Sequence, residues 1–179
     1  HSLRAGFLEL VEREIAHAAA GRHARIVVKS NAVVDTPVIE ALYRASMAGV
    51  DIDLIVWGAC SIQPGLPGLS ERIHVRSIIG EFLEHSRIWG FENGGDGEWY
   101  IGSADLMDRN LDRRVEAVVP VEDSEARARA IWGSVSGERF LRELRGEVVV
   151  WPETRRGMIG HGQVLTGANK TPEGARRVV

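Results

Sequence analysis

The chain has 179 residues, of which 44% are hydrophobic, so it is long enough to bury one full core. Its formal net charge of −3 excludes a global basic field that would attract nucleic acid or a membrane surface, and any anion site must be local. The single cysteine, Cys60, excludes an intramolecular disulfide, and no apolar run is long enough for a membrane span. We expect a cytoplasmic protein, and a start at His1 without methionine or a signal-peptide pattern predicts a fragment of a longer chain.

The chain begins with a segment of helical periodicity. Apolar residues recur at helical spacing from Leu3 to Ala18, which predicts an amphipathic helix that covers a core, and Gly21 is a plausible stop. The sequence RIVVK at Arg25–Lys29 is then typical of a buried strand.

A second helix and strand follow with short links. Asp35 or Thr36 is placed to cap a helix that ends at Gly49, and Ile52–Trp57 is the next apolar run. A strand, a helix and a strand joined in this way favour a parallel, right-handed pair.

Polar side chains stand where these two strands end, namely Lys29, Asn31 and Trp57 with its indole N–H. Ligands of parallel sheets gather at the carboxyl ends of the strands, so these residues are candidates for phosphate binding. For Lys29 alone, a solvated lysine at a strand end is an equally good interpretation.

The middle of the chain contains a loop and a further strand. Ser61–Ser70 is rich in proline and glycine and predicts a loop, whereas Ile73–Ile78 alternates like a strand. His74 and Arg76 share the face opposite the apolar residues, and an exposed strand face explains them without any chemistry.

Three more short strands are predicted at Arg87–Phe91, Glu98–Gly102 and Arg114–Val119. The turn sequence Asn93–Gly97 joins the first two as a hairpin. The whole pattern predicts an α/β fold with a mixed, mostly parallel sheet flanked by helices.

Chemically active side chains stand at the ends of these strands. His85 and Arg87 are two residues apart, so both lie on one face. The other candidates are Ser103, Asp105, Asn110, Arg113, Arg114 and Glu116. An imidazole with several guanidiniums suits phosphoryl or phosphodiester chemistry, because the charge on phosphate oxygens must be neutralised and histidine can act as a nucleophile or a proton donor.

Arg109, Arg113 and Arg114 form a local basic cluster that suits bidentate phosphate contacts. The alternative is that these arginines are exposed and pair with Asp108 and Asp112. Two carboxylates have a supporting role in this hypothesis. Glu116 and Asp105 would order the histidine and arginine side chains, or would hold a divalent ion together with the phosphates, with Glu116 as the favoured metal ligand.

The end of the chain changes in character. Residues 122–144 are rich in Glu, Arg and Ala and predict a helix interrupted near residues 133–137. From about residue 151 the sequence is basic and without apolar periodicity. We expect one domain over residues 1–150 and a basic, poorly ordered tail over 151–179.

Several motifs resemble known families. His85-x-Arg87, Gly102-Ser103-x-Asp105 and a downstream glutamate resemble a variant of the phospholipase D pattern of His-x-Lys, an acidic residue and Gly-Ser-x-Asn. A closer resemblance, over about residues 7–145, is to the last domain of the type 1 polyphosphate kinases. It is carried by FLEHSRIWGFENGGD, YIGSADLMDRNLDRRVE and VVKSNAVVDTPVIEALYRASMAGVDIDLIV.

The resemblance implies a phospholipase D-like domain and one half of an active-site cleft. Such kinases transfer the terminal phosphoryl group of ATP reversibly to polyphosphate, with Mg²⁺, through a phosphohistidine in a preceding phospholipase D-like domain. His85 matches the histidine that binds the nucleotide phosphates and assists transfer. The resemblance thus implies ATP or ADP and polyphosphate as substrates, the preceding domain as a partner, a homo-oligomer, and an isolated chain that is inactive alone.

Two positions depart from the kinase pattern, because Trp57 and Glu81 stand where arginine is usual. Both changes remove positive charge, and tryptophan can stack on a base but cannot neutralise phosphate. Two alternatives therefore stay open: a degenerate, non-catalytic module that binds nucleotides or polyanions, and a phospholipase D-like phosphodiesterase.

Overall fold

A computed structural model describes residues 2–77 and 85–122 of the chain. Its helices and strands are α1 (Leu3–Ala19), β1 (Arg25–Ser30), α2 (Thr36–Met47), β2 (Asp51–Val56), β3 (Ile73–Arg76), β4 (Arg87–Phe91), β5 (Glu98–Gly102) and β6 (Val118–Pro120). Two short helical turns, η1 (Asn93–Gly95) and η2 (Arg109–Arg113), complete the set. Glu81, the helix predicted over 122–144 and the tail predicted over 151–179 lie outside the described residues, apart from Glu122.

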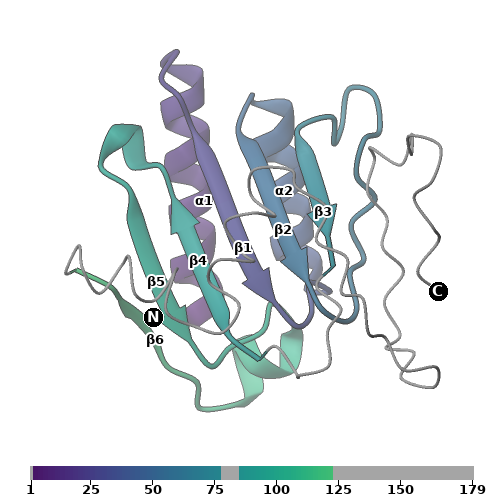
Figure 1. Ribbon diagram of the computed structural model, residues 1–179, viewed down its shortest axis with the longest axis vertical. Helices are drawn as coiled ribbons and strands as arrows, with labels where there is room; N and C mark the ends of the chain where they lie inside the picture. Colours follow the sequence, from purple (N-terminus) through teal and green to yellow (C-terminus); the bar gives the residue numbers. More distant parts are fainter. Residues whose placement is uncertain (1, 78–84, 123–179) are drawn as a thin grey trace, which may run out of the picture.

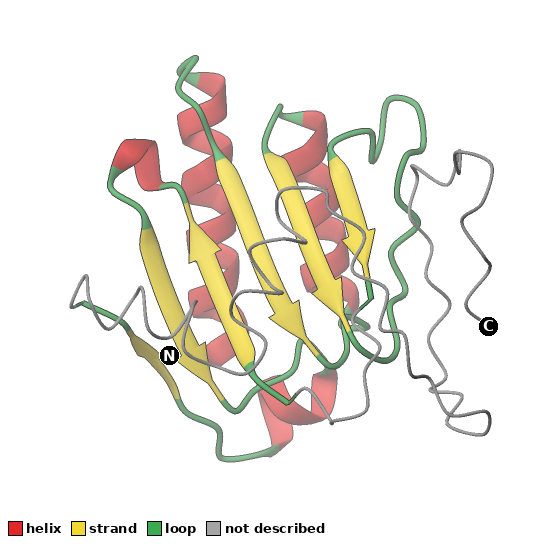
Figure 2. Cartoon of the chain, viewed as in Figure 1, coloured by secondary structure: helices red, strands yellow, loops and turns green. Residues whose placement is uncertain are grey.

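The strands form one mixed sheet with the order β3-β2-β1-β4-β5-β6. The pairs β1–β2 and β2–β3 are parallel, whereas β1–β4, β4–β5 and β5–β6 are antiparallel. The prediction of a mixed sheet is confirmed, but parallel pairs do not predominate. The short link at residues 92–97 makes β4 and β5 an antiparallel hairpin, and β4 and β6 each pair antiparallel with a further strand. Helices α1 and α2 lie side by side on the same face of the sheet (Figures 1 and 2).

Both helices begin and end where the sequence predicts. Ser2 caps α1 by accepting a hydrogen bond from the Ala5 backbone N–H at 3.2 Å, and Asp35 caps α2 by accepting one from Val38 at 3.2 Å. Gly21 and Gly49 follow the helices with φ values of 72° and 100°, a left-handed conformation that glycine adopts without strain.

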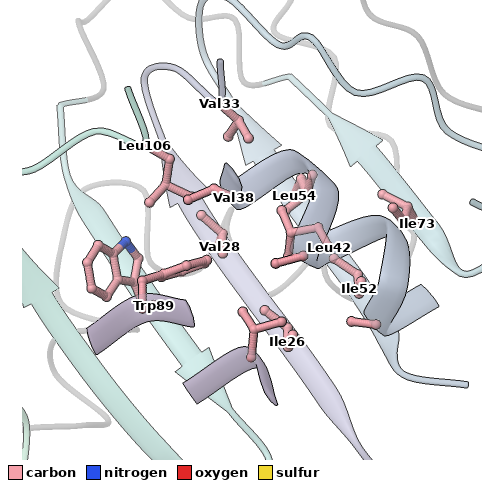
Figure 3. Packing of buried hydrophobic residues seen from close by; sticks show 14 of the residues in the cluster. Ile26, Val28, Val33, Val38, Leu42, Ile52, Leu54, Ile73, Trp89 and Leu106 are labelled. Carbon is pink, nitrogen blue, oxygen red and sulfur yellow. The ribbon is translucent and has the colours of Figure 1, made fainter. Parts of the chain in front are cut away.

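The core lies between the helices and the sheet, where apolar side chains of β1, β2, α2 and β4 interdigitate (Figure 3). Phe7 of α1 is fully buried and packs edge-on against Trp89, with ring centroids 4.9 Å apart, and against Phe91 at 5.9 Å. This aromatic cluster fixes α1 on the antiparallel half of the sheet.

Replacing Phe7 with alanine is expected to lower the free energy of unfolding by about 3–5 kcal/mol, because it leaves a cavity between α1 and β4. Chemical denaturation followed by circular dichroism measures this loss. The exposed Met47 provides a control, and Met47→Ala is expected to change stability by less than about 0.5 kcal/mol. A Phe7 variant as stable as the parent chain would contradict this assignment of the core.

Two strand predictions need correction. The last strand is Val118–Pro120 rather than Arg114–Val119, because the side chains of Ser103 and Asn110 hold Glu116 in the loop before the strand. Arg76 is not merely solvated, since its Nη1 donates to Asp53 Oδ1 at 2.8 Å across the β2–β3 pair. In the described part of the chain, no helix combines the length and apolarity that crossing a membrane requires.

Candidate functional site

Most of the predicted site residues lie at one end of the sheet, the lower end in Figure 1, where β1 and β5 finish and β4 begins. The register explains this juxtaposition. Lys29 on β1 is opposite Ile88 on β4, and Arg87 is opposite Gly102 on β5. Residues that are far apart in the sequence are therefore brought together by strand pairing alone.

Asp105 is the buried centre of this end of the sheet. Its Oδ1 accepts hydrogen bonds from Ser30 Oγ at 3.0 Å, from the Asn31 backbone N–H at 2.9 Å and from Arg87 Nε at 3.1 Å. Its Oδ2 accepts a second bond from Arg87 Nη2 at 3.0 Å, which completes a bidentate ion pair. This carboxylate therefore ties the end of β1 to the start of β4.

The pKa of Asp105 reflects two opposing effects. Burial raises the pKa, because it disfavours the charged form. The hydrogen bonds from Arg87, the Asn31 backbone and Ser30 outweigh burial, so that the pKa of Asp105 lies below its ordinary value. The carboxylate is charged at neutral pH and can balance the guanidinium of Arg87.

Arg87 in turn holds His85. The Arg87 Nη1 donates to the backbone oxygen of His85 at 2.8 Å and lies 2.7 Å from its Nδ1, while Nη2 lies 3.2 Å from its Nε2. The side chain of Arg87 is only 10% exposed, whereas His85 is exposed. A chain of contacts thus runs from the buried Asp105 through Arg87 to an imidazole at the surface.

Lys29 is buried, with 3% of its surface exposed, and its Nζ donates to Ser86 Oγ at 2.8 Å. The interpretation of Lys29 as a solvated strand-end lysine is therefore wrong. Its charge is held beside the His85 segment in a region of reduced dielectric, where it acts more strongly than in water.

A second carboxylate, Glu116, closes the site on the β6 side. It accepts hydrogen bonds from Ser103 Oγ and from Asn110 Nδ2, the latter at 2.5 Å, and the Ser103 hydroxyl also accepts one from the Ala117 backbone. The Ser103 hydrogen bond is the main reason why the pKa of Glu116 lies below its ordinary value, and nearby Arg114 contributes in the same direction.

The three arginines of the basic cluster lie in or next to η2 and are exposed. Arg113 Nη2 lies 3.2 Å from Asp108 Oδ2, so the predicted pairing with Asp108 is confirmed for this arginine. Asp112 instead pairs with Arg4, at the other end of the described chain, a partner that the local sequence pattern does not indicate. Asn110 and Leu111 of the same turn, η2, are buried and anchor it to the rest of the domain.

Trp57 directly follows β2, beside the end of β1. Its backbone N–H donates to Ser30 O at 3.2 Å, and the next residue, Gly58, donates to Asn31 O at 2.9 Å. A Cβ at Gly58 would lie 2.8 Å from that oxygen, so glycine permits the close approach. Trp57 itself is half-buried and belongs to the same end of the sheet as Asp105.

The structure thus brings together most of the predicted residues, from Lys29 and Asn31 through His85, Arg87 and Asp105 to Glu116. It also adds Ser30 and Ser86, which the sequence analysis missed. Their positions in the sequence could have indicated them, because Ser30 directly follows Lys29 and Ser86 stands between His85 and Arg87. Among residues 2–77 and 85–122, no three His, Cys, Asp or Glu side chains gather in a way that could hold a metal ion.

Comparisons with known proteins agree with this arrangement. Residues 1–132 match the family model described as polyphosphate kinase C-terminal domain 2. The chain is 62% identical over 122 residues to a polyphosphate kinase of Thermosynechococcus vestitus, which covers 68% of this chain and 17% of the relative. It is 58% identical over 121 residues to a polyphosphate kinase of Pseudomonas aeruginosa, with 68% and 18% covered.

A solved structure gives the same result. The crystal structure of polyphosphate kinase from Porphyromonas gingivalis superposes with a TM-score of 0.72 at 42% identity, over 80% of this chain and 21% of that one. The chain therefore spans about a fifth of the length of these relatives. With the family model matched over residues 1–132, this chain belongs to the polyphosphate kinase family, in which it corresponds to the C-terminal domain.

Proposed function

We propose that this domain supplies one half of a phosphotransfer cleft, in which the terminal phosphoryl group of ATP is transferred reversibly to polyphosphate. The observation that carries the proposal is the gathering of His85 and three exposed arginines at the same end of the sheet, on a member of this family. Catalysis of phosphoryl transfer depends mainly on positioning the substrates and on stabilising negative charge. His85 and the three arginines can contribute to both.

In this proposal the exposed arginines 109, 113 and 114 contact the phosphate oxygens. Guanidiniums are suited to this task because their planar N–H groups match a phosphate bidentately. Buried Lys29 adds positive charge at the same end of the sheet. Asn31 and Trp57 lie at this end too, directly after β1 and β2.

His85 is the residue that would act on the reacting phosphoryl group, by holding a phosphate oxygen or donating a proton to it. Arg87 keeps the imidazole in place through its hydrogen bond to the His85 backbone and its close contacts with the ring nitrogens. Asp105 in turn keeps Arg87 in place through the bidentate ion pair. With its guanidinium engaged by Asp105 and His85, Arg87 would position the histidine and contribute charge, in addition to the direct phosphate contact that the sequence predicts.

We further propose that Glu116 supports a Mg²⁺ ion that the substrate brings with it. One carboxylate fits this role, because Mg²⁺ in such sites is held by one or two carboxylates together with substrate phosphates and water. The ion would neutralise charge on the phosphates. Ser103 and Asn110 would orient the carboxylate through their hydrogen bonds to it.

The remaining parts of the proposal concern the whole protein, of which this chain would be the last part. A preceding phospholipase D-like domain would provide the phosphohistidine and the other wall of the cleft. Polyphosphate and an adenine nucleotide would be the substrates, and the protein would work in the cytoplasm as a homo-oligomer.

Trp57 leads to a specific prediction. Trp57→Arg is expected to raise the affinity for tripolyphosphate about three- to tenfold, because it places a guanidinium beside Ser30 and Asn31. Titration calorimetry measures the change, and Trp57→Phe, which adds no charge, serves as the control. An unchanged affinity in Trp57→Arg would favour a site whose role has shifted away from phosphate.

The proposal is tested by ³¹P nuclear magnetic resonance of the complete protein with ADP, polyphosphate and Mg²⁺. Formation of ATP, with no hydrolysis of a generic phosphodiester, is the expected result. Hydrolysis of the diester without ATP formation would support the phosphodiesterase. Binding of nucleotide without either reaction would support the non-catalytic module, and both outcomes would overturn the proposed activity.

A further inference from the structure

Arg4, in the first turn of α1, gathers carboxylates from two distant segments. Its Nε and Nη2 donate to Asp35 at 3.1 and 2.7 Å, its Nη1 lies 2.5 Å from Asp112, and its Nη2 lies 3.5 Å from Asp108. The Arg4 side chain is 19% exposed, and that of Asp35 is 2% exposed. These ion pairs raise the pKa of Arg4 above its ordinary value, mainly through the hydrogen bond to Asp35.

The carboxylates that Arg4 contacts belong to elements that frame the site. Asp35 caps α2, and residues 34 and 35 donate backbone hydrogen bonds to Leu106 O. In the sequence, Asp108 and Asp112 stand on either side of Arg109, and both precede Arg113 and Arg114. Arg4 therefore joins the starts of both helices to the turn over residues 108–114 that carries the basic cluster.

Loss of Arg4 would change the charge of this turn. Asp108 already pairs with Arg113 at 3.2 Å, and it shares its other contact with Arg4. Without the guanidinium, Asp112 would lose its ion pair with Arg4, and Asp108 would keep only its pair with Arg113. They would attract Arg113 toward themselves and repel an approaching phosphate.

We propose that Arg4 is a positioning residue of the phosphate site: it neutralises and fixes Asp108 and Asp112, so that the arginines of the 108–114 turn stay available to the substrate. This inference rests on the proposed function, because it assigns Arg4 to the same phosphate site. Arg4 does not itself contact the reacting groups, and it acts through the turn.

The test uses the 179-residue chain and tripolyphosphate in titration calorimetry. Arg4→Met is expected to weaken binding about tenfold at low salt, and the difference should shrink near 1 M salt, where the Debye length falls to about 3 Å. Adding Asp108→Asn and Asp112→Asn to Arg4→Met should restore the affinity to within about threefold, since the negative charges of the 108–114 turn are then gone; Asp35, which is buried at the start of α2, is left unchanged in both variants.

Arg13→Met is the matched control. Arg13 is also on α1 and forms a bidentate pair with Glu98 at 3.2 and 2.7 Å, but Glu98 lies at the other end of β5. This variant should lose a comparable ion pair without loss of tripolyphosphate affinity. An Arg4→Met chain that binds like the parent, or a triple variant as weak as Arg4→Met alone, would overturn the inference.

Hydrogen exchange separates this inference from the proposed function. The amides of residues 110 and 111 donate to Met107 O, and their exchange should accelerate in Arg4→Met but not in Arg13→Met. If the parent chain does not bind tripolyphosphate, the proposed phosphate site is contradicted. Exchange alone then decides whether Arg4 holds the turn, and unchanged exchange at residues 110 and 111 would reject it.

Discussion

Replacing Asp105 with alanine is expected to lower the free energy of unfolding by about 3–5 kcal/mol, because the substitution breaks a buried, bidentate ion pair with Arg87. The side chains of Arg87 and Asp105 are 10% and 7% exposed, so solvent cannot take over the lost interaction. Tripolyphosphate binding should weaken as well, since Arg87 no longer holds His85. Urea denaturation and titration calorimetry measure the two effects.

The pH dependence of stability provides a second readout of the same pair. Because the folded-state pKa of Asp105 lies below the ordinary value of about 4, its contribution to stability is present above that value. The contribution is lost as the pH falls through the lowered folded-state pKa. Asp105→Asn should therefore lose stability at neutral pH and show a shallower decline on acidification than the parent chain.

Asp53 provides a matched control for Asp105. It is also a buried aspartate of the sheet region, with a side chain 7% exposed, and it pairs with Arg25 at 2.6 Å and with Arg76 at 2.8 Å. Asp53→Ala should lower stability to a similar extent but leave tripolyphosphate affinity unchanged. If both variants lost affinity equally, Asp105 would have a general structural role and no special relation to His85.

The second large effect is expected from His85→Ala. If the complete protein has the proposed phosphotransfer activity, this variant should reduce the rate of ATP formation from ADP and polyphosphate by about 10²–10⁴-fold, the usual contribution of a positioned acid or base. The fall should appear mainly in kcat, with a smaller loss of ligand affinity, because the arginines still contact the phosphates. Because His85 is exposed and precedes β4 rather than forming part of it, the folded structure should be retained.

His74 is a suitable control for this experiment, because it is an exposed histidine on β3, away from the Asp105 cluster. His74→Ala should leave the rate within about twofold of the parent enzyme. A His85→Ala enzyme that keeps more than about a third of its activity would show that the imidazole takes no part in transfer.

Much of the fold follows from local signals in the sequence. Helical periodicity with a capping residue and a following glycine defines α1 and α2, and alternating or apolar runs define β1, β2, β4 and β5. The strand Val118–Pro120 was predicted four residues too early, because side-chain hydrogen bonds to Glu116 and Ala117 keep the preceding residues out of the sheet. Local propensity does not reveal such side-chain contacts, which join residues 6 and 14 positions apart.

The same limit applies to the candidate site. The sequence indicates His85, Asp105 and the basic cluster, because polar groups at strand ends stand out against apolar runs. It does not indicate that Arg87 is engaged by Asp105, or that Lys29 is buried against Ser86, since both facts depend on the register of β1, β4 and β5. Arg4 escapes prediction for the same reason, because its partner Asp112 is 108 residues away.

The most direct test of the central claim is a calorimetric titration of the 179-residue chain with ADP, ATP and polyphosphate in the presence of Mg²⁺, repeated with His85→Ala and Arg114→Ala. The parent chain is expected to bind, and each variant is expected to bind more weakly, because both side chains belong to the phosphate site. Binding that neither substitution weakens, or no binding of any of the three ligands, would contradict the placement of a phosphate site at this end of the sheet.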